Sequence, residues 1–200
     1  MENLKTGDLI LFSNNSDTSY WRYFSDIIKY FTHSNYTHIA MILKDPTFIS
    51  DDLKGLYIWE SSWEGIPDAE DHELKLGVQI QPLNEILNKY KDETIVLRTI
   101  NCPKDTFDDI ILQQIHEVVH NKPYDIFPKD WINAFLKKDT EPQKTSKFWC
   151  SALVGYIYTK VGILNKTTDW SILTPNDYSL TGENLSFNNN CNLLSYEEKI

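Results

Sequence analysis

The stretch Lys147–Val154, KFWCSALV, places a cysteine between bulky aromatic residues and the start of an apolar helix. From Trp149 to Val161 the apolar positions recur at helical spacing, and Gly162 follows, so we predict a helix that begins next to Cys150. In the first turn of a helix, unpaired backbone N–H groups and the macrodipole favour a thiolate. Cys150 is therefore a candidate nucleophile, and an ordinary core cysteine is the alternative.

A thiolate nucleophile needs a general base, and the base needs an orienting group. His38 is the candidate base because it opens the apolar run HIAMIL. Glu60 ends the next predicted strand, LYIWE. If the two strands pair as an antiparallel hairpin, His38 and Glu60 lie at the same end of the sheet, where a carboxylate can hold an imidazole in one tautomer. A histidine at the sheet edge and an exposed glutamate at a strand end are the alternatives.

The other histidines lie in polar or helical surroundings that are typical of solvated side chains: His33, His72, His116 and His120. The sequence contains no CxxC motif and no glycine-rich phosphate loop, and we expect its histidines and cysteines to lack close ligand spacing. We therefore expect neither a metal nor another cofactor.

The overall pattern predicts one α+β domain over residues 1–200, with a core at about 7–178 and a polar tail. Apolar runs predict strands at 7–12, 37–43, 56–60, 77–80 and 95–98. Helical spacing predicts helices at 20–32, 83–90 and 106–120. The stretch 121–147 is polar, and the Asn-rich tail after Pro175 is expected to be coil.

Composition excludes several classes of protein. The content of 41% hydrophobic and 13% aromatic residues suits a folded domain, and the net charge of −10 argues against nucleic-acid binding. The N-terminus does not read as a signal peptide, and no apolar stretch reaches the length of a transmembrane segment, so we expect a cytoplasmic protein. The three cysteines, Cys102, Cys150 and Cys191, are far apart and odd in number, so no disulfide framework is expected.

Six motifs follow one another in a recognisable order: GDLILF, YTHIAMIL, YIWES, KPYDIF, FWCSALV and LTPNDY. This set resembles the circularly permuted papain-like NlpC/P60 superfamily, in particular its YiiX-like branch, which includes a poxviral subgroup. The resemblance covers about residues 7–178. It implies a papain-like fold, in which a small antiparallel sheet or half-barrel packs on the cysteine helix. It also implies Cys150 as nucleophile, His38 as base and Glu60 as the residue that orients the base.

The resemblance extends to residues around the thiol. Tyr124 belongs to a Tyr-Asp pair that precedes the cysteine helix in the family, and it is expected to donate a hydrogen bond near the thiol. Trp149 and Ser151 flank Cys150 and are further candidates to contact the substrate or its oxyanion. The family motif reads close to Y-C-S-E-L-V, so Trp149 and Ala152 depart from it and alter the surroundings of the thiol.

These features predict a thiol hydrolase that cleaves an amide or ester bond of a peptide, amide or acyl-lipid substrate through an acyl-enzyme. Two alternatives remain: a lipid acyltransferase or thioesterase that uses the same site, and a catalytically silent binding module. The fold alone does not determine the substrate. Four aromatic residues could line an acyl-chain groove with peripheral membrane contact, but we favour simple core packing for them. These residues are Trp21, Phe24, Trp59 and Trp63.

Overall fold

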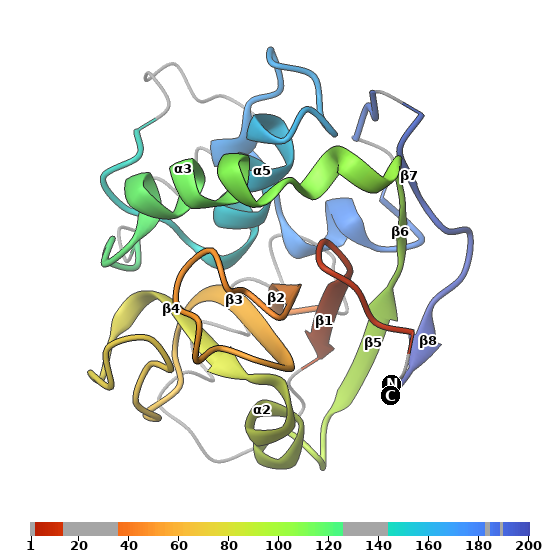
Figure 1. The fold of residues 1–200 in the computed structure, drawn as a ribbon. Coiled ribbons are helices and arrows are strands. Elements are labelled where there is room, and N and C mark those ends of the chain that lie inside the picture. Colours follow the sequence, from red (N-terminus) through yellow and green to blue (C-terminus); the bar gives the residue numbers. More distant parts are fainter. Residues whose placement is uncertain (1–2, 14–35, 126–143, 183–184, 189) are drawn as a thin grey trace.

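A six-stranded antiparallel sheet forms the centre of the computed structural model, which describes residues 3–13, 36–125, 144–182, 185–188 and 190–200 (Figure 1). The strands lie in the order β4-β3-β2-β1-β5-β8. Their bounds are β1 Leu9–Ser13, β2 His38–Lys44, β3 Leu56–Trp63, β4 Leu76–Pro82, β5 Thr94–Arg98 and β8 Glu198–Lys199. The five predicted strands are therefore confirmed, and the mixed content of helix and antiparallel sheet is that of an α+β fold.

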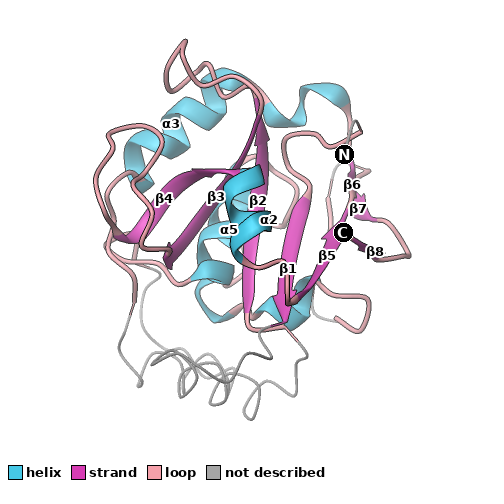
Figure 2. Ribbon diagram, turned by 90° about the horizontal axis from the view of Figure 1, so that it is seen from below, coloured by secondary structure: helices cyan, strands magenta, loops and turns pink. Residues whose placement is uncertain are grey.

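The two faces of this sheet carry separate apolar cores, because successive strand residues point to opposite faces. One core joins residues such as Leu9, Ile39 and Met41 to helices α3 (Asp109–Val119) and α5 (Cys150–Lys160). The other joins residues such as Ile10, Ala40 and Ile58 to helix α2 (Leu83–Lys89). Figures 1 and 2 show α2 on the opposite side of the sheet from α3 and α5.

Helix α5 is buried along nearly its whole length, from Cys150 to Thr159. Such a helix lies inside the core, between the sheet and the short 3-10 helices η2 (Trp170–Ile172) and η3 (Pro175–Tyr178). The extended backbone of Trp149 places Cys150 at the first helical position, and Gly162 adopts a φ of 82° just after the helix. The prediction of a helix that begins at the cysteine is confirmed.

Helix α3 begins later than the sequence pattern predicts, at Asp109. The 3-10 helix η1 (Lys104–Phe107) precedes it, and the Asp108 carboxylate caps α3 by accepting hydrogen bonds from Ile110 N and Ile111 N. The helix predicted at 20–32 and His33 lie outside the described residues, as does the stretch 126–143. No helix in the described ranges is long and apolar enough to cross a bilayer.

The C-terminal tail is not coil throughout, which corrects the sequence-based expectation. Strand β8 pairs with β5, and β7 (Asn192–Leu193) pairs with β6 (Ile100–Asn101). The buried Arg98 holds the tail, because its Nη1 donates to the carbonyl oxygens of Leu194 and Tyr196 at 2.6 and 2.7 Å. The polar composition of the tail conceals this contact, which depends on a guanidinium far away in the sequence.

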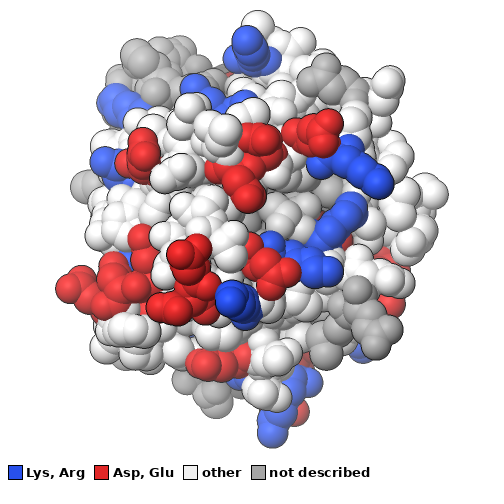
Figure 3. Space-filling model, in the orientation of Figure 1, with Lys and Arg blue, Asp and Glu red and all other residues white. Residues whose placement is uncertain are grey.

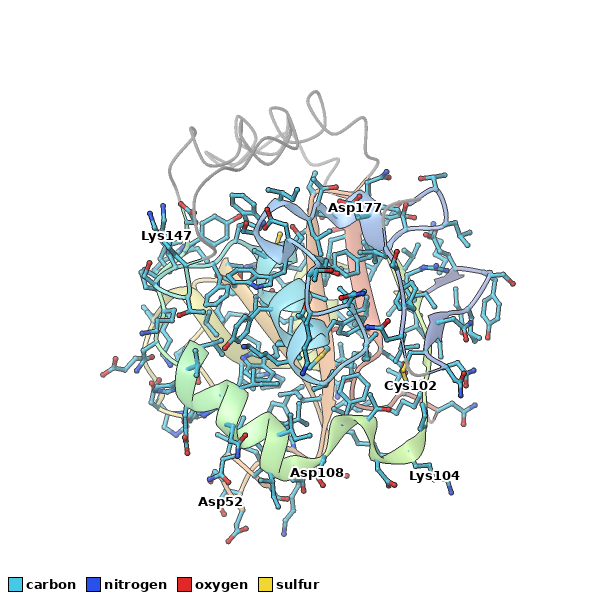
Figure 4. All side chains as sticks on the ribbon, turned by 90° about the horizontal axis from the view of Figure 1, so that it is seen from above. Asp52, Cys102, Lys104, Asp108, Lys147 and Asp177 are labelled. Atoms are coloured by element: carbon cyan, nitrogen blue, oxygen red, sulfur yellow. A yellow bond between two sulfur atoms is a disulfide. The ribbon has the colours of Figure 1, made fainter. Side chains whose placement is uncertain are left out.

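A disulfide joins Cys102 to Cys191, so the expectation of no disulfide is wrong. It lies next to the β6–β7 pair, where the two chain segments come together. Figure 4 shows it as a yellow bond beside the label of Cys102, close to Lys104 at the start of η1. Only Cys150 is a free thiol, and it is buried.

Candidate active site

His38 and Glu60 form a direct contact at one end of the sheet. Strands β2 and β3 pair with Met41 opposite Trp59, and this register carries Glu60 to the position diagonal to His38 on the same face. His38 Nε2 lies 2.5 Å from Glu60 Oε2, and Glu60 is only 1% exposed. The proximity predicted from the hairpin is confirmed.

Cys150 lies at the other side of the His38 ring. Burial opposes the charge on this imidazole, but hydrogen bonds to Cys150 and Glu60, together with the negative charges of both groups, raise the pKa of His38 well above its usual value of 6.5. Because Nε2 is occupied by Glu60, Nδ1 is the ring nitrogen left to face the sulfur. The arrangement favours the charged imidazolium form of His38 at neutral pH.

The start of the cysteine helix is tied to the strand that carries Glu60. The Phe148 carbonyl oxygen accepts hydrogen bonds from Ser61 Oγ at 2.7 Å and from Asp125 N at 3.1 Å. Strand β3 continues past its predicted end at Glu60, because the residues from Ser61 to Trp63 pair with β4. Two residues of one strand thus fix both the histidine and the approach to Cys150.

Tyr124 lies beside the thiol, as expected. Its backbone N donates to Leu76 O, and it forms a bridge with Phe148, two residues before Cys150. Burial, followed by the negative charges of Cys150 and Asp125, raises the pKa of Tyr124 well above 10. The phenol consequently stays protonated and is able to donate a hydrogen bond near the sulfur.

The close approach of the Tyr124 segment to the sheet depends on Gly77. A Cβ at this position would lie 2.2 Å from the Lys122 carbonyl oxygen, and Gly77 adopts a φ of 151°. The same carbonyl oxygen accepts a hydrogen bond from Val78 N. Because only glycine leaves room there, the chain comes near enough for Tyr124 to reach the thiol.

The two neighbours of Cys150 have different surroundings. The Ser151 hydroxyl donates to the Leu173 carbonyl oxygen at 2.7 Å, so this side chain tethers α5 to the following loop and only its backbone N–H stays available in the first helical turn. Trp149 Nε1 is buried and has no acceptor among the described residues. Of the two candidates, Trp149 is the one whose side chain offers an unused donor.

Glu64 is a second carboxylate near His38 that sequence reasoning missed. Its Oε2 accepts hydrogen bonds from Lys89 Nζ and Tyr90 Oη, and its Oε1 accepts from Ser62 Oγ. Burial raises the pKa of Glu64, but the charges of His38 and Lys89 outweigh it and lower the pKa below 4.5. The signal available was a glutamate one residue past a strand whose last four residues are Glu60, Ser61, Ser62 and Trp63.

Glu60 and Glu64 are predicted to affect stability in opposite directions. Burial and the charge of Glu64 raise the pKa of Glu60, so the folded state disfavours the Glu60 charge at every pH above the unfolded value. Glu60→Gln should therefore raise the melting temperature at pH 7, whereas Glu64→Gln should lower it, with a gap of at least about 3 °C between the variants. Thermal unfolding from pH 3 to 7 tests this, and the gap should close as pH falls below 4.5.

Glu60→Gln also tests the effect of the Glu60 carboxylate on the pKa of His38. In Glu60→Gln the imidazole loses the carboxylate that raises its pKa, so the NMR titration of His38 should move to lower pH while the fold is kept. A protein that is destabilised at pH 7 by Glu60→Gln, or an unmoved His38 titration, would contradict the role given to Glu60.

A second group of potential ligands lies on α3 and the β3–β4 loop. Glu70, His116 and His120 bring their ligand atoms within 4.8 Å of one another. His116 and His120 are the two histidines of the stretch HEVVH (116–120), which is an HExxH motif, so the expectation that the histidines lack close ligand spacing is wrong. Both are also paired with Glu70 rather than simply solvated.

Comparison with known proteins supports the fold. No family model matches the sequence, and no curated protein matches it either. Among solved structures, the chain is similar to YiiX from Escherichia coli O157:H7, described as a metalloprotein of DUF1105, with a TM-score of 0.50 and 20% sequence identity. The match covers 78% of this chain and 66% of YiiX. At this identity the match supports a YiiX-like fold and leaves the activity open.

Proposed function

We propose that the chain is a thiol hydrolase of the circularly permuted papain-like type, which cleaves an amide or ester bond of a peptide, amide or acyl-lipid substrate. The observation that carries the proposal is the hydrogen-bonded series of a free Cys150, His38 and Glu60 at the start of a buried helix. Each group has the type of neighbour that nucleophile, base and orienting carboxylate need.

The chemistry follows from this series. The Cys150 thiolate attacks the substrate carbonyl carbon, and the carbonyl π electrons move to oxygen to form a tetrahedral oxyanion. First-turn N–H groups of α5 and the neutral Tyr124 phenol are the available donors to that oxyanion. The His38 imidazolium then gives its proton to the leaving nitrogen or oxygen, which leaves a thioester on Cys150. Water attacks the thioester with His38 as base, and the acid product leaves.

A metal centre at the same cluster is the second candidate, because YiiX is described as a metalloprotein and because His38, Glu60 and Glu64 offer ligand atoms within 4.8 Å of one another. These residues fit a metal poorly. Both oxygens of Glu64 already accept hydrogen bonds, and His38 Nε2 is held by Glu60. In the described part of the chain, Glu60 Oε1 is the one carboxylate oxygen of the cluster without a partner. Proton transfer uses these contacts as they stand, whereas a metal would have to displace them.

The proposal predicts an acyl adduct on Cys150. The purified protein is mixed with p-nitrophenyl esters of short and long acyl chains and with peptide p-nitroanilides, then quenched in acid and digested. Mass spectrometry should find the acyl group on the peptide that contains Cys150, and hydroxylamine should remove it. Cys150→Ala is the control and should carry no adduct. If no donor acylates or turns over while the thiol still reacts with an alkylating agent, the binding-module alternative replaces the hydrolase.

A further inference from the structure

Glu70, His116 and His120 converge at a place separate from the Cys150 site. Glu70 Oε2 lies 2.9 Å from His116 Nε2 and 3.1 Å from His120 Nδ1, so one carboxylate oxygen faces a nitrogen of each imidazole. The two rings lie with their centroids 4.9 Å apart on one face of α3. Three groups that bind transition metals thus point at a common centre.

The sequence builds this arrangement from two rigid parts. Residues one turn apart on a helix share a face, which places His116 above His120. The centroid of the His116 ring also lies 6.1 Å from the ring centroid of the buried Trp59. Glu70 is fixed by the turn before it. The buried Asp68 accepts hydrogen bonds from Glu70 N at 2.7 Å and from Ile80 N at 2.9 Å. The carboxylate is therefore presented from a loop that is bonded to strand β4.

The lysine of this loop pairs with two aspartates, whereas Glu70 pairs with the two histidines. Lys75 Nζ binds Asp68 at 3.2 Å and Asp71 at 2.6 Å. Within the described ranges, Glu70 forms ion pairs with His116 and His120. A histidine carries a positive charge only when it is protonated. Figure 3 shows acidic side chains gathered on the side of this face where the β3–β4 loop and β4 lie. The surroundings are thus negative and suit a cation.

The distances match a small tetrahedral ion. With metal–ligand bonds of about 2.0–2.1 Å, the ligand atoms of a tetrahedral site lie roughly 3.3 Å apart, and the two contacts with Glu70 differ from this by only a few tenths of an ångström. Two imidazoles and one carboxylate favour zinc over magnesium or calcium, which prefer all-oxygen sites. We propose that Glu70, His116 and His120 form a zinc site with a fourth position open to water.

Asn121 supplies the outer contact that such a site needs. Its Nδ2 lies 2.7 Å from His120 Nε2, the ring nitrogen that faces away from Glu70. With a metal on Nδ1, the proton resides on Nε2, and the Asn121 amide turned by 180° accepts it through its oxygen. Asn121 adopts a φ of 55° directly after the helix, a conformation that asparagine tolerates better than most residues.

The site would stabilise the helix end that leads to the thiol. His120 is the C-cap residue that follows α3, and two and four residues later the backbones of Lys122 and Tyr124 bond to β4, which brings Tyr124 beside Cys150. A zinc ion bound by these residues would connect this helix end to the β3–β4 loop and would not contact Cys150 or His38. Its expected effect in the test below is therefore on the stability of this helix end.

The test uses the full-length Cys150→Ala protein, in which the thiol no longer competes for metal, after dialysis against a chelator. Calorimetric titration with zinc chloride should give one ion per chain, and the melting temperature should rise by about 5 °C or more when free zinc exceeds its dissociation constant a hundredfold. Cobalt(II) bound in place of zinc should show the visible absorption of a four-coordinate ion.

Matched variants locate the site. His116→Ala and His120→Ala should each weaken zinc binding at least about a hundredfold, and the isosteric Glu70→Gln at least about tenfold. His72→Asn, a change in the same loop at a position with a φ of 62°, should leave affinity unchanged. Circular dichroism checks that each variant is folded. Zinc binding that survives the histidine variants, or that is lost with Cys150→Ala alone, would overturn the proposal.

Discussion

Replacing His38 with glutamine is expected to slow acylation of Cys150 by at least about a thousandfold. Glutamine is able to donate a hydrogen bond to Glu60 in place of the imidazole, so the buried carboxylate keeps a partner. It cannot take a proton from the thiol or give one to the leaving group. The rate constant for acyl-enzyme formation from the best p-nitrophenyl ester measures the effect.

The alanine variant of His38 provides the matched comparison. His38→Ala leaves Glu60, which is 1% exposed, without its partner, so it should also lower the melting temperature, because an unpaired buried carboxylate is costly. The double variant His38→Ala/Glu60→Gln should recover stability and stay inactive. If His38→Gln acylates at the wild-type rate, His38 is not the base.

Reduction of the Cys102–Cys191 disulfide is expected to produce the largest loss of stability. The bond closes a loop between residues that are 89 positions apart, and a bridge of this span contributes about 3–5 kcal/mol by restricting the unfolded chain. Dithiothreitol should therefore lower the melting temperature by roughly 10 °C. The double variant Cys102→Ala/Cys191→Ala should melt at the reduced temperature with or without dithiothreitol.

A thiol count decides whether the bridge exists in the purified protein. Unfolded without reductant, the wild-type chain should expose one thiol to Ellman's reagent, that of Cys150. Three thiols, together with a melting temperature that dithiothreitol leaves unchanged, would contradict the bridge and restore the expectation of no disulfide.

The sequence predicts most of the site because its signals are local. HIAMIL and LYIWE are short apolar runs that pair as neighbouring strands, and this alone brings His38 to Glu60. The recurrence of apolar residues from Trp149 onward likewise places Cys150 at a helix start. In each case the period of the hydrophobic pattern determines the geometry.

The missed features depend on contacts between distant segments. The pairing of the tail with β5 and β6 rests on Arg98 and the disulfide, and neither partner can be deduced from a polar, Asn-rich stretch. Glu64 acquires its role from Lys89 on α2, and Glu70 meets His116 and His120 only after the β3–β4 loop folds onto α3. Trp59, one candidate for a lipid groove, is fully buried in the core, while Trp63 is 42% exposed.

The most direct test of the Cys150–His38 pair is the alkylation rate of Cys150 by iodoacetamide from pH 5 to 9, with the labelled peptide identified by mass spectrometry. We predict that Cys150 in the folded wild-type protein reacts at pH 6 at least about tenfold faster than in the unfolded chain, and that His38→Gln abolishes this advantage. Equal rates at pH 6 in the folded wild-type and His38→Gln proteins would contradict the thiolate–imidazolium pair, and with it the proposed hydrolase.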